Sequence, residues 1–233
     1  MTDEIRNRLI GWAHEYNDPK YFQEDPIIFP TRFVRKHEAG EASLADVEIA
    51  AILSAHLAWG RRAMIVRACN RMFEEMNWKP YDYVMNGEYR CEDASLHRTI
   101  KWSEFAGICA RLKSIYESRD SIEDMSDMEI RCRIFGQKED KKAPNKKISM
   151  MRRWMVRDDG KVDLGVWKRS DKKRLILPLD VHVYEQAYAL GLTSRSQKDI
   201  VTALEITDAF RKIFPEDPCL GDFALFGYGV THR

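Results

Sequence analysis

The sequence lacks the features that mark membrane, secreted and metal-binding proteins. No apolar run approaches the ~20 residues of a membrane-spanning helix, and Met1 to Arg6 lack the apolar stretch of a signal peptide. Five cysteines are scattered among 233 residues without a C-x-x-C pair, which disfavours disulfides and an iron–sulfur centre. We therefore expect a cytoplasmic protein with reduced thiols, no membrane contact, no metal and no cofactor.

The chain also has little net charge, +1, so its overall charge gives no sign of a polyanionic partner. The distribution is uneven, because residues 138–174 hold fourteen Lys or Arg against six Asp or Glu. That segment carries +8, which leaves −7 for the remainder. Concentrated positive charge suits a phosphate backbone, and a solvated linker explains the same composition equally well.

Hydrophobic periodicity predicts a mainly α protein, since no alternation of period two and no internal repeat stands out. The expected helices cover 3–16, 43–60, about 61–79, 102–117, 121–135, 146–157, 181–190, 196–213 and a last stretch from about 220. The two prolines of residues 25–30 predict an extended segment there. We expect a single helical domain over 1–233, which divides at most into two interleaved lobes, about 40–120 and about 1–39 plus 121–233.

Two predicted helix starts carry the candidate chemistry. Lys146 and Lys147 follow Pro144-Asn145, with Asn145 as the expected N-cap, and Asp180 precedes the helix that ends at Gly191. A lysine attacks carbon only when unprotonated, and burial or a helix N-terminus favours the neutral amine. A carboxylate at a helix N-terminus stays ionised. Plain capping by Asp180 and a surface position for the lysines are the simpler alternatives.

The segments around these residues resemble helix-hairpin-helix DNA glycosylases. The stretch from Leu177 to Val183, LPLDVHV, is similar to the family's V/L-P-V-D-x-H-V pattern with its catalytic aspartate. The stretch from Ile52 to His56, ILSAH, resembles an L-L-S-x-Q helix end, with His56 at the glutamine-like position. The end of the chain, residues 222–227, resembles the family's last helix.

The lysine side of the pattern departs from that family, because L-P-G-V-G followed by the catalytic lysine is absent. Lys146 to Met155, KKISMMRRWM, instead resembles the lysine-bearing helix of the archaeal 8-oxoguanine DNA glycosylases. In that branch the lysine precedes the aspartate by some thirty residues, and here 180 − 146 = 34. The whole chain also resembles a bacterial family of uncharacterised proteins through its R-W-M-V-R and P-L-D-x-H-V blocks.

The resemblance implies a two-lobed helical architecture with a central cleft, and a base-excision repair glycosylase that is a monomer associated with the nucleoid. Its partner would be double-stranded DNA with a damaged base such as 8-oxoguanine, flipped into a pocket. Lys146 would form a Schiff base with the sugar, Asp180 would assist, and Lys147 is the alternative nucleophile. The expected DNA or base contacts are His56, Arg61, Arg62, Trp154, Lys172, Lys173, Arg174 and His182.

Two other classes stay open at this point. The chain can be a helical nucleic-acid-binding module without chemistry, or a helical protein-interaction domain in which Asp180 only caps a helix. For Trp154 a place in the core is the simpler expectation, and for His182 a place on the surface.

Overall fold

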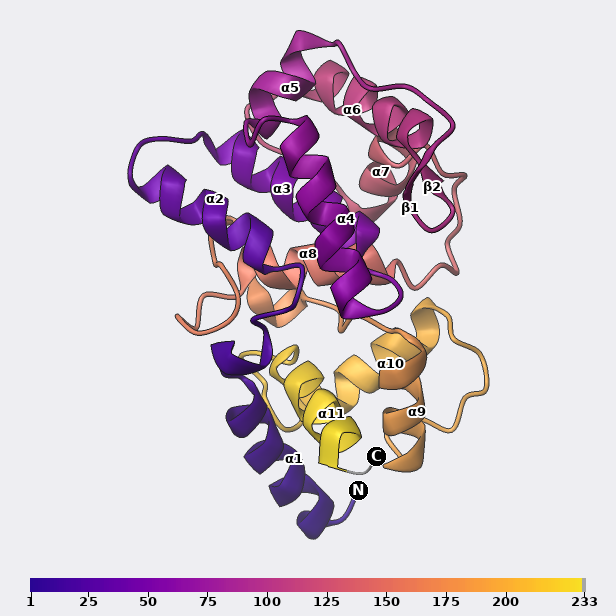
Figure 1. Ribbon diagram of the computed structural model, residues 1–233. Coiled ribbons are helices and arrows are strands. Elements are labelled where there is room, and N and C mark those ends of the chain that lie inside the picture. Colours follow the sequence, from indigo (N-terminus) through magenta and orange to yellow (C-terminus); the bar gives the residue numbers. More distant parts are fainter. Residues whose placement is uncertain (232–233) are drawn as a thin grey trace. The chain divides into compact units, whose positions relative to one another are not determined.

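The protein is mainly helical, as the sequence predicts. The computed structural model describes the backbone of residues 1–231 and the side chains of residues 1–229, and it contains eleven α-helices and one two-stranded sheet in that range (Figure 1). None of the described helices combines the length and the apolar content that crossing a membrane requires. All five cysteines are free thiols.

The chain forms two compact units. One consists of residues 23–139, and the other joins residues 1–22 to residues 140–233. The chain thus leaves the second unit after Phe22 and returns to it at Asp140.

The unit 23–139 is built around one almost completely buried helix, α3 (Leu44–Leu57), which α2, α4 and α5 cover. Ser43 and Asp46 form the predicted capping box at its start. Twelve of the fourteen α3 residues are buried, including Glu48, whose carboxylate accepts hydrogen bonds from the Tyr116 hydroxyl and the Ile122 amide. The other elements are α2 (Ile28–Glu38), α4 (Arg62–Glu75), α5 (Pro80–Asn86), β1 (Ser95–His97), β2 (Ile100–Lys101), α6 (Trp102–Tyr116), α7 (Asp127–Glu129) and a π-helical turn (Ile130–Ile134).

Three local predictions for this unit are wrong. Helix α2 begins at Ile28, inside the segment expected to be extended, because Pro30 lies in the first turn, where no intrahelical donor is lost. Helix α3 ends at Leu57 and not at Gly60, although Gly60 does adopt a left-handed φ of +105°. The expected helix over 121–135 begins only at Asp127, where the Ser126 side chain caps it.

The sequence does not predict the hairpin β1–β2. Its strands contain three and two residues, which is too short for a visible alternation of polar and apolar residues. Ser95 pairs with Lys101 and His97 with Ile100, and β1 packs on α4.

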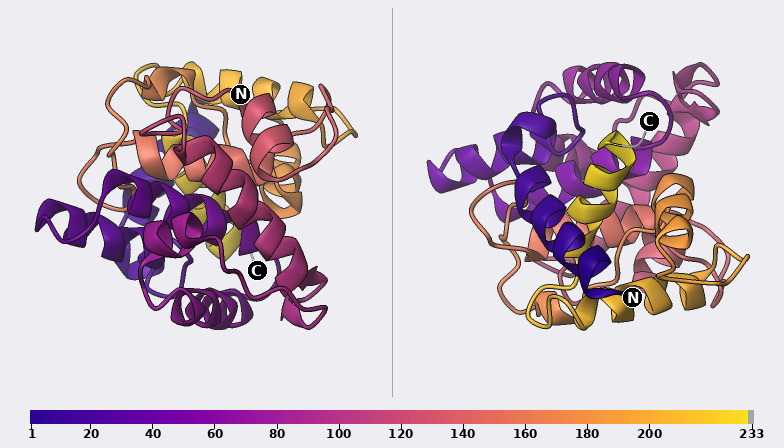
Figure 2. Two further views of the ribbon diagram at one scale, coloured as in Figure 1. Left: turned by 90° about the horizontal axis from the view of Figure 1, so that it is seen from above. Right: turned by 90° about the horizontal axis from the view of Figure 1, so that it is seen from below.

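The second unit pairs the first and last helices of the chain. Helices α1 (Asp3–Tyr16) and α11 (Leu220–Thr231) lie side by side (Figures 1 and 2). A Cβ on Gly227 would come within 2.3 Å of the Tyr16 ring, so glycine permits this close approach. The remaining elements are a 3₁₀ turn (Pro19–Tyr21), α8 (Lys146–Val156), a second 3₁₀ turn (Lys172–Arg174), α9 (Val181–Ala189) and α10 (Ile200–Arg211). Helix α10 starts four residues later than predicted, because the Asp199 side chain caps it.

Candidate active site

Lys146 and Asp180, the two residues that carry the predicted chemistry, form an ion pair. The Lys146 Nζ atom lies 3.7 Å from Asp180 Oδ2, and the two side chains are 27% and 34% exposed. The other carboxylate oxygen, Asp180 Oδ1, accepts a hydrogen bond of 2.9 Å from the Val183 amide at the start of α9. One oxygen of Asp180 therefore caps the helix while the other faces the amine.

Asp180 is held in place by the apolar segment before it. Leu175, Leu177 and Leu179 are buried, and the Leu177 amide donates to Thr207 Oγ1 of α10 at 3.1 Å. Pro178 has no N–H and so leaves no donor unsatisfied in this buried stretch. The buried segment 175–179 therefore fixes the position of the partly exposed Asp180 carboxylate.

Lys146 is the first residue of α8, and the core of the unit anchors this helix. Ile148, Met151 and Trp154 are buried on one side of it. Asn145 occupies the N-cap position, as predicted, but with left-handed backbone angles (φ 47°, ψ 38°) and without a side-chain capping hydrogen bond. The loop before it is tied to α10, because the Ile200 amide donates to the Lys142 carbonyl at 3.0 Å.

A buried network of arginines and aspartates lies farther along α8. Arg157 is fully buried and binds Asp159 at 2.9 Å and Asp217 at 2.8 Å, and it also contacts Asp163. Arg153 bonds to Asp163 at 3.2 Å. Burial raises the pKa of Asp163, and the two guanidinium groups oppose that effect. Two of the fourteen cations of segment 138–174 are thus paired with carboxylates inside the unit.

Asp222 links this network electrostatically to the candidate site, and it is not among the site residues that the sequence predicts. It lies in the first turn of α11 and contacts Arg153. Burial raises the pKa of Asp222, the Arg153 charge opposes the rise, and the charge of Asp180 adds to it. No local pattern marks Asp222, because its partner Arg153 is 69 positions away in the chain.

The other site residues predicted in this unit differ in their exposure and in their ion-pair partners. Lys147 is half-buried beside Lys146, and Arg174 is exposed. Lys172 and Lys173 bind carboxylates of their own unit, with Nζ–O distances of 3.1 Å to Asp158 and 2.6 Å to Glu216. To contact DNA as predicted, each of these two lysines would have to leave its carboxylate partner and bind a phosphate.

Two further predicted residues of this unit, Trp154 and His182, are not members of the ion pair. Trp154 is 1% exposed, so its ring has no free face on which a base could stack; the prediction of base stacking is wrong, and the simpler core role holds. His182 is exposed on α9, where its Nδ1 atom lies 3.9 Å from Glu185.

The remaining predicted contacts belong to the unit 23–139. His56 is 7% exposed and its ring stacks on Phe135, with centroids 4.8 Å apart. Arg61 is the N-cap residue of α4, Arg62 is its first residue, and both are exposed.

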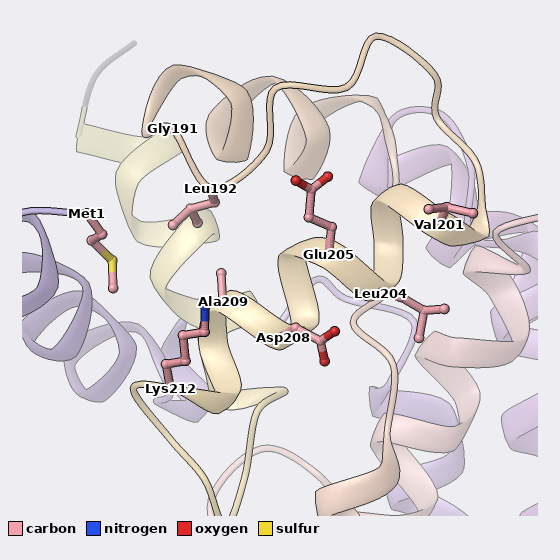
Figure 3. A pocket seen from close by; sticks show the side chains of 9 residues that line it. All are labelled: Met1, Gly191, Leu192, Val201, Leu204, Glu205, Asp208, Ala209 and Lys212. Carbon is pink, nitrogen blue, oxygen red and sulfur yellow. The ribbon is translucent and has the colours of Figure 1, made fainter.

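A pocket of about 490 Å³ in the unit of α8 is separate from the ion pair (Figure 3). It is lined by Met1, the turn after α9 and one face of α10. Figure 3 shows the Glu205 and Asp208 carboxylates along α10, with Lys212 near one end. Thr193 donates a hydrogen bond of 2.7 Å to Glu205. Neither Lys146 nor Asp180 lines this pocket.

Comparison with known proteins places the chain in one family. Residues 25–134 and 127–231 match the family described as "Protein of unknown function (DUF2400)", and the chain belongs to that family. No curated protein and no solved structure matches the chain.

Proposed function

We propose that this protein is a DNA base-excision repair glycosylase with lyase activity, and that Lys146 is its nucleophile. The observation that carries the proposal is the partly exposed ion pair between Lys146 and Asp180 at the starts of two helices. An amine that forms a covalent intermediate needs a neighbouring group that can take its proton. The Asp180 oxygen that faces the amine is in position to do so.

The proposed reaction begins at the sugar of the damaged nucleotide. The Lys146 nitrogen attacks C1′, the glycosidic bond breaks, and the base leaves with the bonding electron pair and takes up a proton. Asp180 accepts the proton that the amine loses and passes it to the departing base, and the regenerated carboxylate charge stabilises the cation that develops at C1′. Opening of the C1′–O4′ bond, with protonation of O4′, then gives the Schiff base.

The unit that holds the pair supports this chemistry through rigidity. Asp180 follows the buried segment 175–179 and caps α9 through its second oxygen, so its orientation is fixed before any substrate binds. Positioned groups of this kind lower the barrier because little reorganisation is needed. We propose a helical DNA-glycosylase-like architecture as the setting of the reaction.

Borohydride trapping tests the proposal. Reduction of the Schiff base joins the protein covalently to DNA, so the wild-type chain should form an adduct with a duplex that contains 8-oxoguanine or an abasic site. Lys146→Ala should abolish the adduct and Lys147→Ala should retain it. Adduct formation by Lys146→Ala would mean that another residue is the nucleophile. DNA binding without an adduct on any damaged duplex would contradict the enzyme and favour a non-catalytic module.

A further inference from the structure

The hairpin turn of the unit 23–139 presents an arginine stacked on a tryptophan. The Arg98 guanidinium lies 4.1 Å from the centre of the Trp59 ring, in the loop between α3 and α4. Arg98 is exposed and adopts left-handed backbone angles (φ 55°), while Trp59 is partly exposed. A stacked guanidinium keeps its edge N–H groups free to donate hydrogen bonds.

Several contacts hold this stack in place. The His97 Nε2 atom lies 2.9 Å from the Trp59 carbonyl oxygen, and the His97 ring meets the Trp59 ring edge-on at 5.9 Å. On the other side of the hairpin, Arg71 of α4 donates to the Ser95 carbonyl at 3.0 Å. The hairpin is therefore attached both to the α3–α4 loop and to α4.

The stack lies against Gly60, directly before Arg61. A Cβ on Gly60 would come within 2.6 Å of Arg98 Nη1, and Gly60 has a φ of +105°, so glycine is required here for both reasons. The guanidinium of Arg98 thus packs against the backbone at the start of α4. Arg61 is the N-cap residue of α4, and Met64 in the first turn of that helix is 45% exposed.

In the part of the chain that the structure describes, Arg98 and Arg61 lack the acidic partners that two cations of the same unit, Arg90 and Lys101, have. Arg90 binds Glu75 and Glu92, and Lys101 binds Asp93. Among the residues that the structure describes, no carboxylate pairs with Arg98 or Arg61. Ordering a long cationic side chain costs conformational entropy. A bound anion would offset that cost for the stacked Arg98 guanidinium.

We propose that Arg98, stacked on Trp59, forms with Arg61 a binding site for the phosphodiester backbone of DNA; the choice of DNA rests on the proposed function. The guanidinium fork matches two phosphate oxygens, and the Trp59 ring holds the fork in place. The hairpin is thereby a DNA-binding element, and it contacts phosphate and not base edges.

Fluorescence anisotropy with a labelled undamaged duplex tests this site, and it needs no catalysis. Arg98→Gln should weaken binding about tenfold at low salt, because one charge-assisted contact is lost. It should also reduce the slope of log Kobs against log salt concentration by about 0.9. Arg35→Gln removes an exposed arginine of α2 in the same unit and serves as the matched control. It should leave both quantities nearly unchanged.

A second variant displaces the guanidinium without removing its charge. Gly60→Ala places a methyl group within 2.6 Å of Arg98 Nη1, so binding should weaken as in Arg98→Gln while net charge stays constant. Trp59→Leu should weaken binding for the same reason, and the double variant Trp59→Leu/Arg98→Gln should be no weaker than Arg98→Gln. Circular dichroism checks that each variant is folded.

The outcomes separate this site from the proposed chemistry. If Arg98→Gln and Arg35→Gln bind equally well with equal salt slopes, the hairpin site is wrong, even if the borohydride adduct forms. If Arg98→Gln weakens binding but no damaged duplex is trapped, the site stands and the glycosylase proposal fails. Absence of DNA binding by the wild-type chain at low salt overturns the site, whatever the trapping shows.

Discussion

Asp180 divides its two oxygens between two helices: Oδ1 accepts the Val183 amide of α9, and Oδ2 lies 3.7 Å from Lys146 Nζ at the start of α8. Capping and catalysis are therefore compatible roles for this carboxylate. The cap orients the side chain, and the orientation directs the second oxygen at the amine.

Two substitutions of Asp180 should separate the roles. Asn is as good an N-cap as Asp, so Asp180→Asn should keep the stability of the wild-type chain but lose most of the borohydride adduct, because the charge is gone. Asp180→Ala should lose the adduct and also about 1 kcal/mol of unfolding free energy. Urea unfolding and trapping assays measure the two effects. Full adduct formation by Asp180→Asn would show that the charge is not needed.

Arg157 should be among the most costly residues to replace. Its guanidinium is fully buried with Asp159, Asp163 and Asp217, so Arg157→Met would leave buried carboxylates without their cation. We expect a loss of about 3–5 kcal/mol in urea unfolding. Arg174→Met, at an exposed position of the same unit, should change stability by less than about 0.5 kcal/mol. Similar values for both variants would contradict the importance of the network.

Two glycines of α11 should respond to alanine in opposite directions. A Cβ on Gly227 would come within 2.3 Å of the Tyr16 ring, whereas one on Gly229 would come no closer than 3.5 Å to the Gln186 side chain. Gly227→Ala should therefore destabilise the chain by about 1–3 kcal/mol through overpacking. Gly229→Ala should stabilise it by up to about 1 kcal/mol through helix propensity. Thermal unfolding of the two variants compares them directly, and stabilisation by both would mean that α1 does not pack closely on α11.

Buried thiols should make the protein less stable at high pH. Burial raises the pKa of Cys69 to about 12, well above the value in an unfolded chain, so between about pH 9 and pH 12 the folded state binds more protons than the unfolded state. The free energy of unfolding then falls as pH rises, by up to about 1.4 kcal/mol per pH unit for this group.

Urea unfolding between pH 8 and pH 11 should therefore show a shallower decline for Cys69→Ala than for the wild-type chain. Cys91→Ala removes an exposed thiol and provides the control, with the wild-type pH dependence. If Cys69→Ala declined as steeply as Cys91→Ala, the Cys69 thiol would ionise equally readily in both states.

Local signals in the sequence determined many of the helices. Capping residues and apolar periodicity predicted α1, the Ser43–Asp46 start of α3 and the Asp180 cap of α9, because these features depend on residues a few positions apart. The same reasoning failed at Pro30, since a proline is read as a helix breaker unless its place in the first turn is known. The hairpin at Arg98 was too short to leave a periodic pattern.

The tertiary structure decided which residues meet. Lys146 and Asp180 are 34 positions apart, and only the packing of α8, the segment 175–179 and α10 brings the amine to the carboxylate. The packing of whole elements also buries Trp154 and brings Arg98 into contact with Trp59. Periodicity and capping depend on residues within one or two helical turns. Contacts between residues far apart in the sequence depend on how whole elements pack, and no short stretch of sequence determines that packing.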